Sequence, residues 1–505
     1  MPELHKALAS YIPAIVTRRL SGDPRPLQAP QSEAVAAAVL FADVSGFTAL
    51  TEALARQGPA GVEKVAAGLN GYFGRLIDII TAHGGDIVKF AGDALTAIWV
   101  ADDGLADAAA AASACGLAIQ TALHACPIDD GVELSLRIGL AAGKIALVHV
   151  GGLGGRWELV LVGRAIEAVR VAEGLARPGE VVVASTLVAL LGDRITGEAR
   201  GEASDHRRVD ALADPVTPRP LVRAPLTDAS AEALRGYVPL AVTTRLAAGQ
   251  SSFLAELRRV SVLFVNLPEL GHATPLARAQ DVMLALQQIV TAHEGTIGHV
   301  GVDHHGATML IAFGLPPLAH EDDAVRSVEA AQQIQSTLTP LGWRTHCGIA
   351  SGRAFCGTLG SPERCEYTVL GDVVNLAARL MQASDGKAIL CDHFTFVAAR
   401  GQFLFEALPP VSVKGKSHAI PLYTPASARL PGRGPQHQRA LSGPMSAAGS
   451  GRPALVGRMR ERVVLVSRLH EVLRGKSTTI VVEGEPGLGK SRLADDLLDQ
   501  AEAMG

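Results

Sequence analysis

Two aspartates lie where short apolar strands end. Asp43 closes a continuous apolar run that is typical of a strand buried on both faces, and Asp93 lies in a turn between two short strands. Carboxylates at adjacent strand ends can hold two Mg²⁺ ions about 4 Å apart, as in-line displacement at phosphorus requires. The backbone N–H groups of Gly46, Phe47 and Thr48 are candidates for binding terminal phosphates. An aspartate in a turn is more often a solvated turn residue, so these positions alone leave both interpretations open.

A second phosphate-binding pattern follows an apolar run at residues 478–483, which predicts a strand. The next residues have the GxxxxGK[ST] spacing and lead into a predicted helix. Gly484 and Gly489 would present backbone N–H groups to phosphate, Lys490 would neutralise it, and Ser491 would hold Mg²⁺. A hydrolytic site also needs an acidic strand end, for which the remaining residues leave no room. We expect the start of a P-loop domain that binds phosphate weakly and does not hydrolyse ATP.

The segments around the two aspartates occur twice in the chain. Residues 39–43 (Val-Leu-Phe-Ala-Asp) recur at 262–266 as Val-Leu-Phe-Val-Asn, and residues 156–163 recur at 364–371, in the same order. Chance similarity does not preserve order over such a length, so we predict two homologous modules. Each alternates strand and helix signals, which indicates an α+β fold with a mainly antiparallel sheet.

The expected elements and domain boundaries follow from this repeat. In the first module strands are predicted at 36–44, 86–90, 94–100, 134–142 and 157–162, and helices at 62–82, at 106–123 and from residue 164. The predicted order is an N-terminal segment (1–33), a first module (34–203), a connector (204–255), a second module (256–425), a flexible linker (426–453) and the P-loop start (454–505).

Composition narrows the classes of protein to consider. The 505 residues are 48% hydrophobic and 19% charged, with a formal net charge of −4, which gives no reason to expect nucleic acid or an anionic membrane as partner. We expect no apolar run to approach the roughly 18 residues of a membrane span, and the N-terminus has no apolar signal-peptide core. The six cysteines lack metal-binding spacing and are interpreted as reduced thiols in a cytoplasmic protein.

The residues that carry chemistry resemble a known family. Residues 41–48 and 89–94 resemble the metal-binding segments of class III adenylyl and guanylyl cyclases, and residues 366–379 resemble their ribose and transition-state segment. Two such modules followed by a P-loop start resemble the soluble, bicarbonate-regulated adenylyl cyclases. The resemblance implies two ferredoxin-like cyclase modules that form a pseudo-twofold pair.

The resemblance also implies roles for individual residues of a working site. Metals would be held at Asp43, Val44 and Asp93. Asn375 would orient the ribose, and Arg379 would stabilise charge that develops on the α-phosphate. Taken alone, Asn375 and Arg379 are ordinary helix residues, and the motif is what favours the functional interpretation.

The two modules carry complementary halves of the family's residues. Arg137 stands where relatives carry a basic residue near the triphosphate. The second module has Asn266 where the first has Asp43, and the first has Glu167 where the second has Asn375. We therefore expect one working site between the modules and one degenerate site.

The degenerate site is a candidate for regulation. Lys89 and Arg170 match the positions with which the bicarbonate-responsive relatives hold the anion, and two cations suit a small planar oxyanion. The alternative is that both are surface or interface cations.

Recognition of the base departs from the family pattern. ATP-selective relatives carry a lysine that reads adenine, and His299 occupies that place, with Thr368 as its partner. An imidazole titrates near pH 6.5, so we expect recognition of adenine to be weaker and to change with pH. The alternative is that His299 is a strand residue and that Thr368 and backbone groups read the base.

These features together predict an adenylyl cyclase that uses two Mg²⁺ or Mn²⁺ ions, forms its site by pairing its own two modules, and is a cytoplasmic monomer that binds ATP and bicarbonate. The alternatives are a guanylyl cyclase and a non-catalytic nucleotide sensor that gates the C-terminal ATPase-type region.

Overall fold

The computed structural model describes most of the chain, over residues 2–46, 59–129, 132–202, 204–247, 256–386, 388–411, 419–429, 459–473 and 479–482 and at residues 490, 493, 496, 497 and 501. Residues 1–318 and 322–429 form one compact unit that contains both modules. Residues 430–505, with 319–321, form a second unit.

The first module is built on a sheet with the strand order β2-β3-β1-β5-β7-β10-β9, to which β4 and β6 add by pairing with β5. The pairs are antiparallel except β5 with β7. The strands are β1 (Gln31–Ser45), β2 (Asp86–Ala91), β3 (Ala94–Val100), β4 (Cys126–Asp129), β5 (Val132–Gly151), β6 (Trp157–Val162), β7 (Val181–Val183), β9 (Ala199–Arg200) and β10 (His206–Arg208). The helices are α4 (Pro59–Ala82), α5 (Leu105–Leu123), α6 (Arg164–Leu175) and α7 (Ser185–Leu191), and β8 (Ile195–Thr196) pairs with β11 (Ala211–Leu212).

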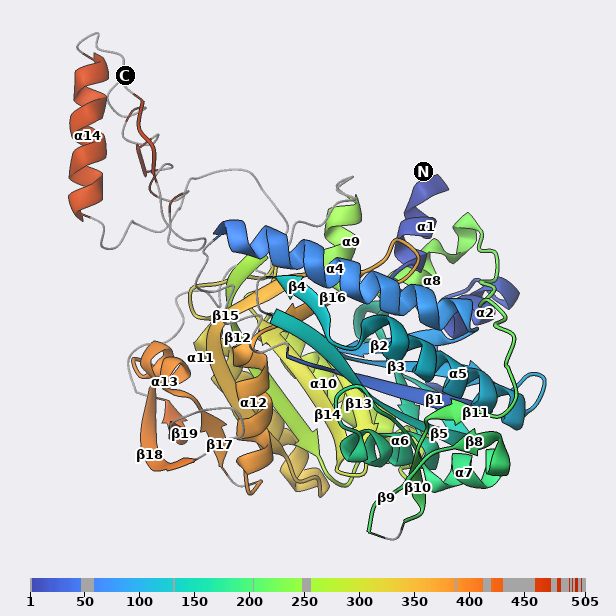
Figure 1. Cartoon of the computed structure of the whole chain (residues 1–505). Helices are drawn as coiled ribbons and strands as arrows, with labels where there is room; N and C mark the ends of the chain where they lie inside the picture. The colour runs from blue at the N-terminus through green and yellow to red at the C-terminus, as the bar shows by residue number, and fades with distance from the viewer. Residues whose placement is uncertain are drawn as a thin grey trace. The chain divides into compact units, whose positions relative to one another are not determined.

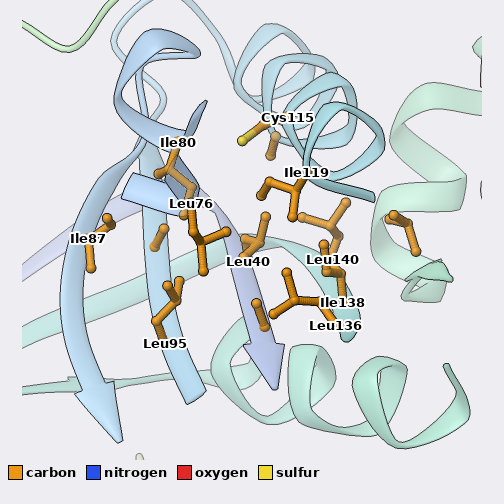
Figure 2. Close-up of a cluster of buried hydrophobic side chains, with 14 of the residues drawn as sticks. Leu40, Leu76, Ile80, Ile87, Leu95, Cys115, Ile119, Leu136, Ile138 and Leu140 are labelled. Atoms are coloured by element: carbon orange, nitrogen blue, oxygen red, sulfur yellow. The ribbon is translucent and has the colours of Figure 1, made fainter. Parts of the chain in front are cut away.

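Helices cover both faces of the β1 strand, which explains its continuous apolar run. Leu40 packs with Leu76 of α4 and Ile119 of α5 on one face (Figure 2). Val39 packs with Val169 of α6 on the other. A strand covered on both faces cannot alternate apolar and polar residues, so the run predicted at 36–44 is confirmed within β1.

Helix α5 is a core helix with unusual composition. Among the described residues, α5 is a helix long and apolar enough to cross a membrane, judged by length and composition alone. Half of its apolar stretch is buried inside the structure. The expectation that no run approaches a membrane span was therefore wrong by this measure. Ala109, Ala112 and Cys115 are fully buried in the core that α5 shares with α4 and β1. The alanines let the helix lie close to the sheet.

The second module repeats this plan with the strand order β13-β14-β12-β15-β17-β19-β18, and β16 pairs with β15. Its strands are β12 (Glu256–Leu267), β13 (Thr296–Asp303), β14 (Gly306–Phe313), β15 (His346–Gly360), β16 (Cys365–Leu370), β17 (Ile389–Cys391), β18 (Phe403–Val411) and β19 (Ile420–Arg429). Its helices are α10 (Leu276–Ala292), α11 (Asp323–Leu338), α12 (Asp372–Ala383) and α13 (His393–Ala399). The prediction of two α+β modules with mainly antiparallel sheets is confirmed (Figure 1).

In each module one long helix, α4 in the first and α10 in the second, forms hydrogen bonds with a strand end of the other module. Gln280 of α10 exchanges hydrogen bonds with the backbone of Gly151 at the end of β5. In the reciprocal contact, Asn70 of α4 accepts a hydrogen bond from the N–H of Gly360 at the end of β15. The long central strands and the first helices thus produce the pseudo-twofold pair.

Two pairs of short helices precede the modules and bind across the unit: α1 (Pro2–Ala9) with α2 (Ala14–Gly22), and α8 (Ala231–Arg235) with α9 (Leu240–Ala247). Asp86 of β2 accepts the N–H groups of Ala14 and Ile15 at the start of α2, at 2.8 and 2.7 Å. The N–H of Cys365 in β16 donates to the carbonyl of Ser10. The first helix pair therefore contacts both modules.

The second unit contains helix α14 (Met459–Leu473). Residues 479–482 have no regular secondary structure, so the strand predicted at 478–483 is not observed over these residues. Gly484, Gly489 and Ser491 lie outside the described residues, and Lys490 is helical. The predicted P-loop start is not confirmed.

Candidate composite active site

The strand pairing of the first module brings the two predicted metal ligands together. Asp43 in β1 lies opposite Ala94 of β3, next to Asp93. The N–H of Val44 donates to the backbone carbonyl of Asp93, at 3.2 Å. Burial, followed by the charge of Asp43, raises the pKa of Asp93 to about 7. Such crowding of two carboxylates is relieved when a cation binds between them.

The strand end next to these carboxylates depends on Gly46. Its φ of +99° lies in the left-handed region, and a Cβ atom there would meet the carbonyl oxygen of Glu133 at 2.6 Å. Glycine is therefore required at this turn. Phe47 and Thr48, the other predicted triphosphate residues, lie outside the described residues.

Arg137 binds two carboxylates at this site. It pairs with Asp43 in the β1–β5 ladder, and its guanidinium forms an ion pair with the Asp43 carboxylate. The same Nη2 atom lies 3.1 Å from Oε1 of Glu173 on α6. Glu173 is buried and also contributes to the raised pKa of Asp93. The sequence did not point to Glu173; comparing the repeats would have, because Met381 is its counterpart.

The second module replaces this charged arrangement with neutral groups. Asn266, at the place of Asp43, is buried and donates from Nδ2 to the carbonyls of His305 and Ala307, at 3.0 and 3.2 Å, and to Oγ1 of Thr308. A carboxylate could not donate these bonds. Asn266 thus fixes the hairpin of its own module, and its amide nitrogen is not a metal ligand.

A cavity of about 940 Å³ lies between the modules and joins the predicted working and regulatory sites. Five predicted residues line it: Lys89, Asp93, Arg170, His299 and Asn375. Asn375 lies on the first turns of α12 and Asp93 at the β2–β3 turn, so a predicted metal ligand of the first module and the predicted ribose residue of the second line the same cavity.

Two of the predicted residues, Arg379 and Thr368, belong neither to the group around Asp43 and Arg137 nor to the cavity lining. Arg379 and Thr368 are both half-buried but are not among the described residues that line the cavity. Arg379 lies one turn after Asn375 on α12, on the same side of the helix, and forms no hydrogen bond or ion pair with any residue that the structure describes.

His299 lies at the meeting point of the two predicted sites. Burial, followed by the charges of Lys89 and Arg170, lowers the pKa of His299 to about 3. Its Nδ1 is buried and finds no hydrogen-bond partner among the described residues. The expectation that this imidazole titrates near pH 6.5 was therefore wrong, because two cations and low solvation keep it neutral. A neutral imidazole offers one donor and one acceptor to a ligand.

Lys89 and His299 are structural counterparts. Both follow a bulge, between Ile87 and Lys89 in β2 and between Ile297 and His299 in β13. The predicted anion partner, Arg170, stacks over the ring of Phe41, with the guanidinium carbon 3.9 Å from the ring centroid. This stacking leaves the guanidinium edge available for a planar ligand.

A buried arginine of the second module holds the β2 bulge. Arg364 is 1% exposed and donates from Nε to the carbonyl of Ile87, at 2.9 Å, and from Nη2 to that of Val88, at 3.3 Å. Glu366 accepts the N–H of Phe90 at 3.2 Å. The Arg-x-Glu pattern that recurs at 156–158 and 364–366 was the available signal for this contact.

The side of the pair that was predicted to be degenerate contains a different contact. Glu167 of α6, at the place of Asn375, lies 2.7 Å from Nδ1 of His272, beside a hollow of about 500 Å³. The Glu167 carboxylate thus contacts a histidine of the second module, whereas its counterpart Asn375 lines the cavity.

The donor chemistry at Asp43 and Asp93 fits a divalent cation that also binds substrate. Among the described residues no group of three or more His, Cys, Asp or Glu side chains could hold a metal ion. Mg²⁺ commonly takes only one or two carboxylates and completes its shell with water and substrate phosphates. Two carboxylates with the Val44 backbone are therefore a fitting set.

Comparison with known proteins gives consistent matches. The family described as the adenylate and guanylate cyclase catalytic domain matches residues 27–208 and 255–424. Adenylate cyclase type 10 of Rattus norvegicus is 28% identical over 530 residues, which cover 96% of this chain and 32% of the relative. Adenylate cyclase 1 of Rhizobium meliloti is 26% identical over 356 residues, 59% of this chain and 52% of the relative. The chain spans about a third of the length of the type 10 relatives it matches.

Among solved structures, a class III adenylyl cyclase-like ATP-binding protein from Pseudomonas aeruginosa superposes with a TM-score of 0.51 at 12% identity. The match covers 76% of this chain and 92% of that chain. This likeness shows the fold alone: a pair of class III cyclase modules.

Proposed function

The chain belongs to the family of adenylate and guanylate cyclase catalytic domains, and from that premise we propose that it converts ATP to 3′,5′-cyclic AMP and pyrophosphate at one site between its modules. The asymmetry of the pair carries this proposal. Asp93 of the first module, which adjoins Asp43 through the pairing of β1 with β3, lines the cavity that Asn375 of the second module also lines, whereas Asn266 and Glu167 stand at the counterpart positions of Asp43 and Asn375.

In the proposed reaction the ribose 3′-oxygen attacks the α-phosphorus, a new 3′-O–P bond forms, and the bond to pyrophosphate breaks. Two Mg²⁺ or Mn²⁺ ions would assist deprotonation of the 3′-hydroxyl and polarise the α-phosphate. Asp43, Asp93 and the Val44 backbone hold the cations, and Gly46, Phe47 and Thr48 bind the terminal phosphates. Asn375 orients the ribose.

Arg379 has the role of stabilising charge on the α-phosphate, and Arg137 that of a cation near the triphosphate. Because Arg379 is not among the described residues that line the cavity, closure of the modules on ATP is part of the proposal. Closure would bring Arg379 to the reacting centre only when substrate is present.

Regulation by bicarbonate is the second part of the proposal. Lys89 and Arg170 line the cavity that contains His299, and both charges act on the His299 ring. An anion bound between them would partly cancel these charges and change the environment of the base. An anion bound at the proposed regulatory site would therefore act on the proposed base site directly, without a chain of intervening residues.

The proposal extends to a cytoplasmic monomer, since the chain supplies both halves of its site. The segment with Gly484, Gly489, Lys490 and Ser491 is proposed as a separate phosphate-binding segment. Purified chain incubated with ATP or GTP and Mg²⁺ or Mn²⁺, with products separated by chromatography and identified by mass, tests the activity. Cyclic GMP as the main product would make it a guanylyl cyclase, and binding without any cyclic product would make it a sensor.

A further inference from the structure

Arg137 and the two carboxylates that it contacts, Asp43 and Glu173, form a charged group, and their counterparts in the second module carry no carboxylate. In the first module Asp43 faces Arg137 across β1 and β5, and Glu173 of α6 completes the group. In the second module the same ladder position pairs Asn266 with His346.

The counterpart of Glu173 in the second module can be identified from the contacts between strand and helix in each module. A Cβ atom on Gly139 of β5 would meet the backbone nitrogen of Glu173, and one on Gly348 of β15 would meet that of Met381. Glu173 and Met381 are therefore structural counterparts. The counterparts of Asp43, Arg137 and Glu173 are Asn266, His346 and Met381, so the second module has neither the acidic pair nor the arginine at these positions.

We propose that Arg137 is the resident counter-ion of Asp43 and that Glu173 is a positioning residue, which takes over the guanidinium when a divalent cation binds Asp43. The inference rests on the proposed role of Asp43 as a metal ligand. In the structure the guanidinium of Arg137 is shared between both carboxylates.

The energetic reason is that a guanidinium and a divalent cation compete for the same carboxylate. An arginine displaced from Asp43 without another partner would leave a partly buried charge unpaired, which is costly. Glu173 already lies 3.1 Å from Nη2, so the guanidinium can change its main partner by side-chain rotation. Without Glu173, the arginine would stay on Asp43 and oppose cation binding.

Mn²⁺ binding to the full chain without nucleotide, measured from the free-ion signal in electron paramagnetic resonance, tests this exchange. Glu173→Gln should weaken Mn²⁺ binding about threefold to tenfold, and Arg137→Met should strengthen it. The loss caused by Glu173→Gln should be clearly larger when Arg137 is present than in the Arg137→Met background. Equal or smaller losses with Arg137 present would mean that Glu173 acts only through its charge, and would overturn the proposal.

Two controls separate the proposal from its premise. Glu167→Gln makes the same chemical change on the same helix but beside His272, and it should leave Mn²⁺ binding unchanged. If Asp43→Asn does not weaken Mn²⁺ binding, the proposed metal role itself fails, and the exchange fails with it. Should Arg137→Met not fold, crystal structures of the native chain with and without Mn²⁺ decide: Arg137 is expected on Glu173 when Mn²⁺ is bound, and its retention on Asp43 overturns the exchange.

Discussion

The ammonium group of Lys89 lies 3.6 Å from a carboxylate oxygen of Glu366, so an ion pair joins the two modules beside their shared cavity. Lys89 belongs to β2 of the first module, and Glu366 to β16 of the second, the strand that also carries Thr368. An anion that binds Lys89 has to compete with this carboxylate. Lys89, which is proposed to bind bicarbonate, therefore contacts the strand that also carries the predicted base-binding residue Thr368.

This contact gives a prediction about regulation. Lys89→Ala or Arg170→Ala should reduce the ratio of rates with and without bicarbonate to about one. Glu366→Gln should lower the bicarbonate concentration for half-maximal stimulation by roughly threefold, because it removes the competing carboxylate. Initial rates of cyclic AMP formation over a bicarbonate series measure both. Stimulation that survives loss of Lys89 and of Arg170 would place the anion elsewhere.

The metal ligands give a second prediction. Asp43→Ala or Asp93→Ala should abolish turnover while the chain stays folded, since neither side chain is part of the apolar core. Arg137 would keep Glu173 as a partner after loss of Asp43. Product formation at saturating Mn²⁺, with circular dichroism for folding, checks this. Substantial activity in either variant would contradict a single metal site.

The asymmetry of the pair gives a third prediction. Asn375→Ala or Arg379→Ala should lower kcat by on the order of 10²-fold or more, because each loses a contact in the transition state. Glu167→Ala, at the corresponding place in the first module, should cost little beyond its contact with His272. Steady-state kinetics of the three variants compare the two sides, and similar losses on both sides would indicate two working sites.

His299 gives a fourth prediction. Because its pKa is lowered to about 3, the imidazole is neutral throughout pH 6 to 8, and the ATP/GTP preference should not change over that range. His299→Lys should lower KM for ATP or raise the preference for ATP by about threefold to tenfold, the value of one hydrogen bond. Kinetics of His299→Lys and His299→Ala with both nucleotides test this. Unchanged ratios in both variants would remove His299 from the base site.

Acid stability gives a fifth prediction, at the contact between Tyr237 and His149. The Tyr237 hydroxyl lies 2.8 Å from Nδ1 of His149, and burial lowers the pKa of this imidazole to about 4. The unfolded chain, with a pKa near 6.5, takes up the proton first as the pH falls. The free energy of unfolding should therefore decrease from pH 6.5 towards pH 4, by up to roughly 3 kcal/mol from this residue.

Urea unfolding at a series of pH values measures this dependence. His149→Gln should flatten the slope, because an amide does not titrate, whereas the same change at the exposed His124 should not. An unchanged slope in His149→Gln would assign the acid sensitivity to other groups.

The repeat and the order of strands and helices could be predicted from the sequence. Asp43, Asp93 and Asn375 could also be named from it as candidates, and their roles stay predictions. Periodicity and strand ends are local properties of the chain, and the order of repeated segments is independent of how they pack. The difference between Asp43 and Asn266 alone indicated that the two sides of the pair are unequal.

Only the tertiary structure decided how these residues meet. It brought Lys89 and Arg170 of the first module near His299 of the second. Burial and these two charges lower the pKa of His299, whereas the sequence alone left the imidazole with its ordinary pKa near 6.5. It also brought Glu173 to Arg137 and the guanidinium of Arg364 to the bulge at Ile87. The physical reason is that solvation, charge and hydrogen-bond partners at a buried site are set by side chains far apart in the sequence, which only packing of the two modules brings together.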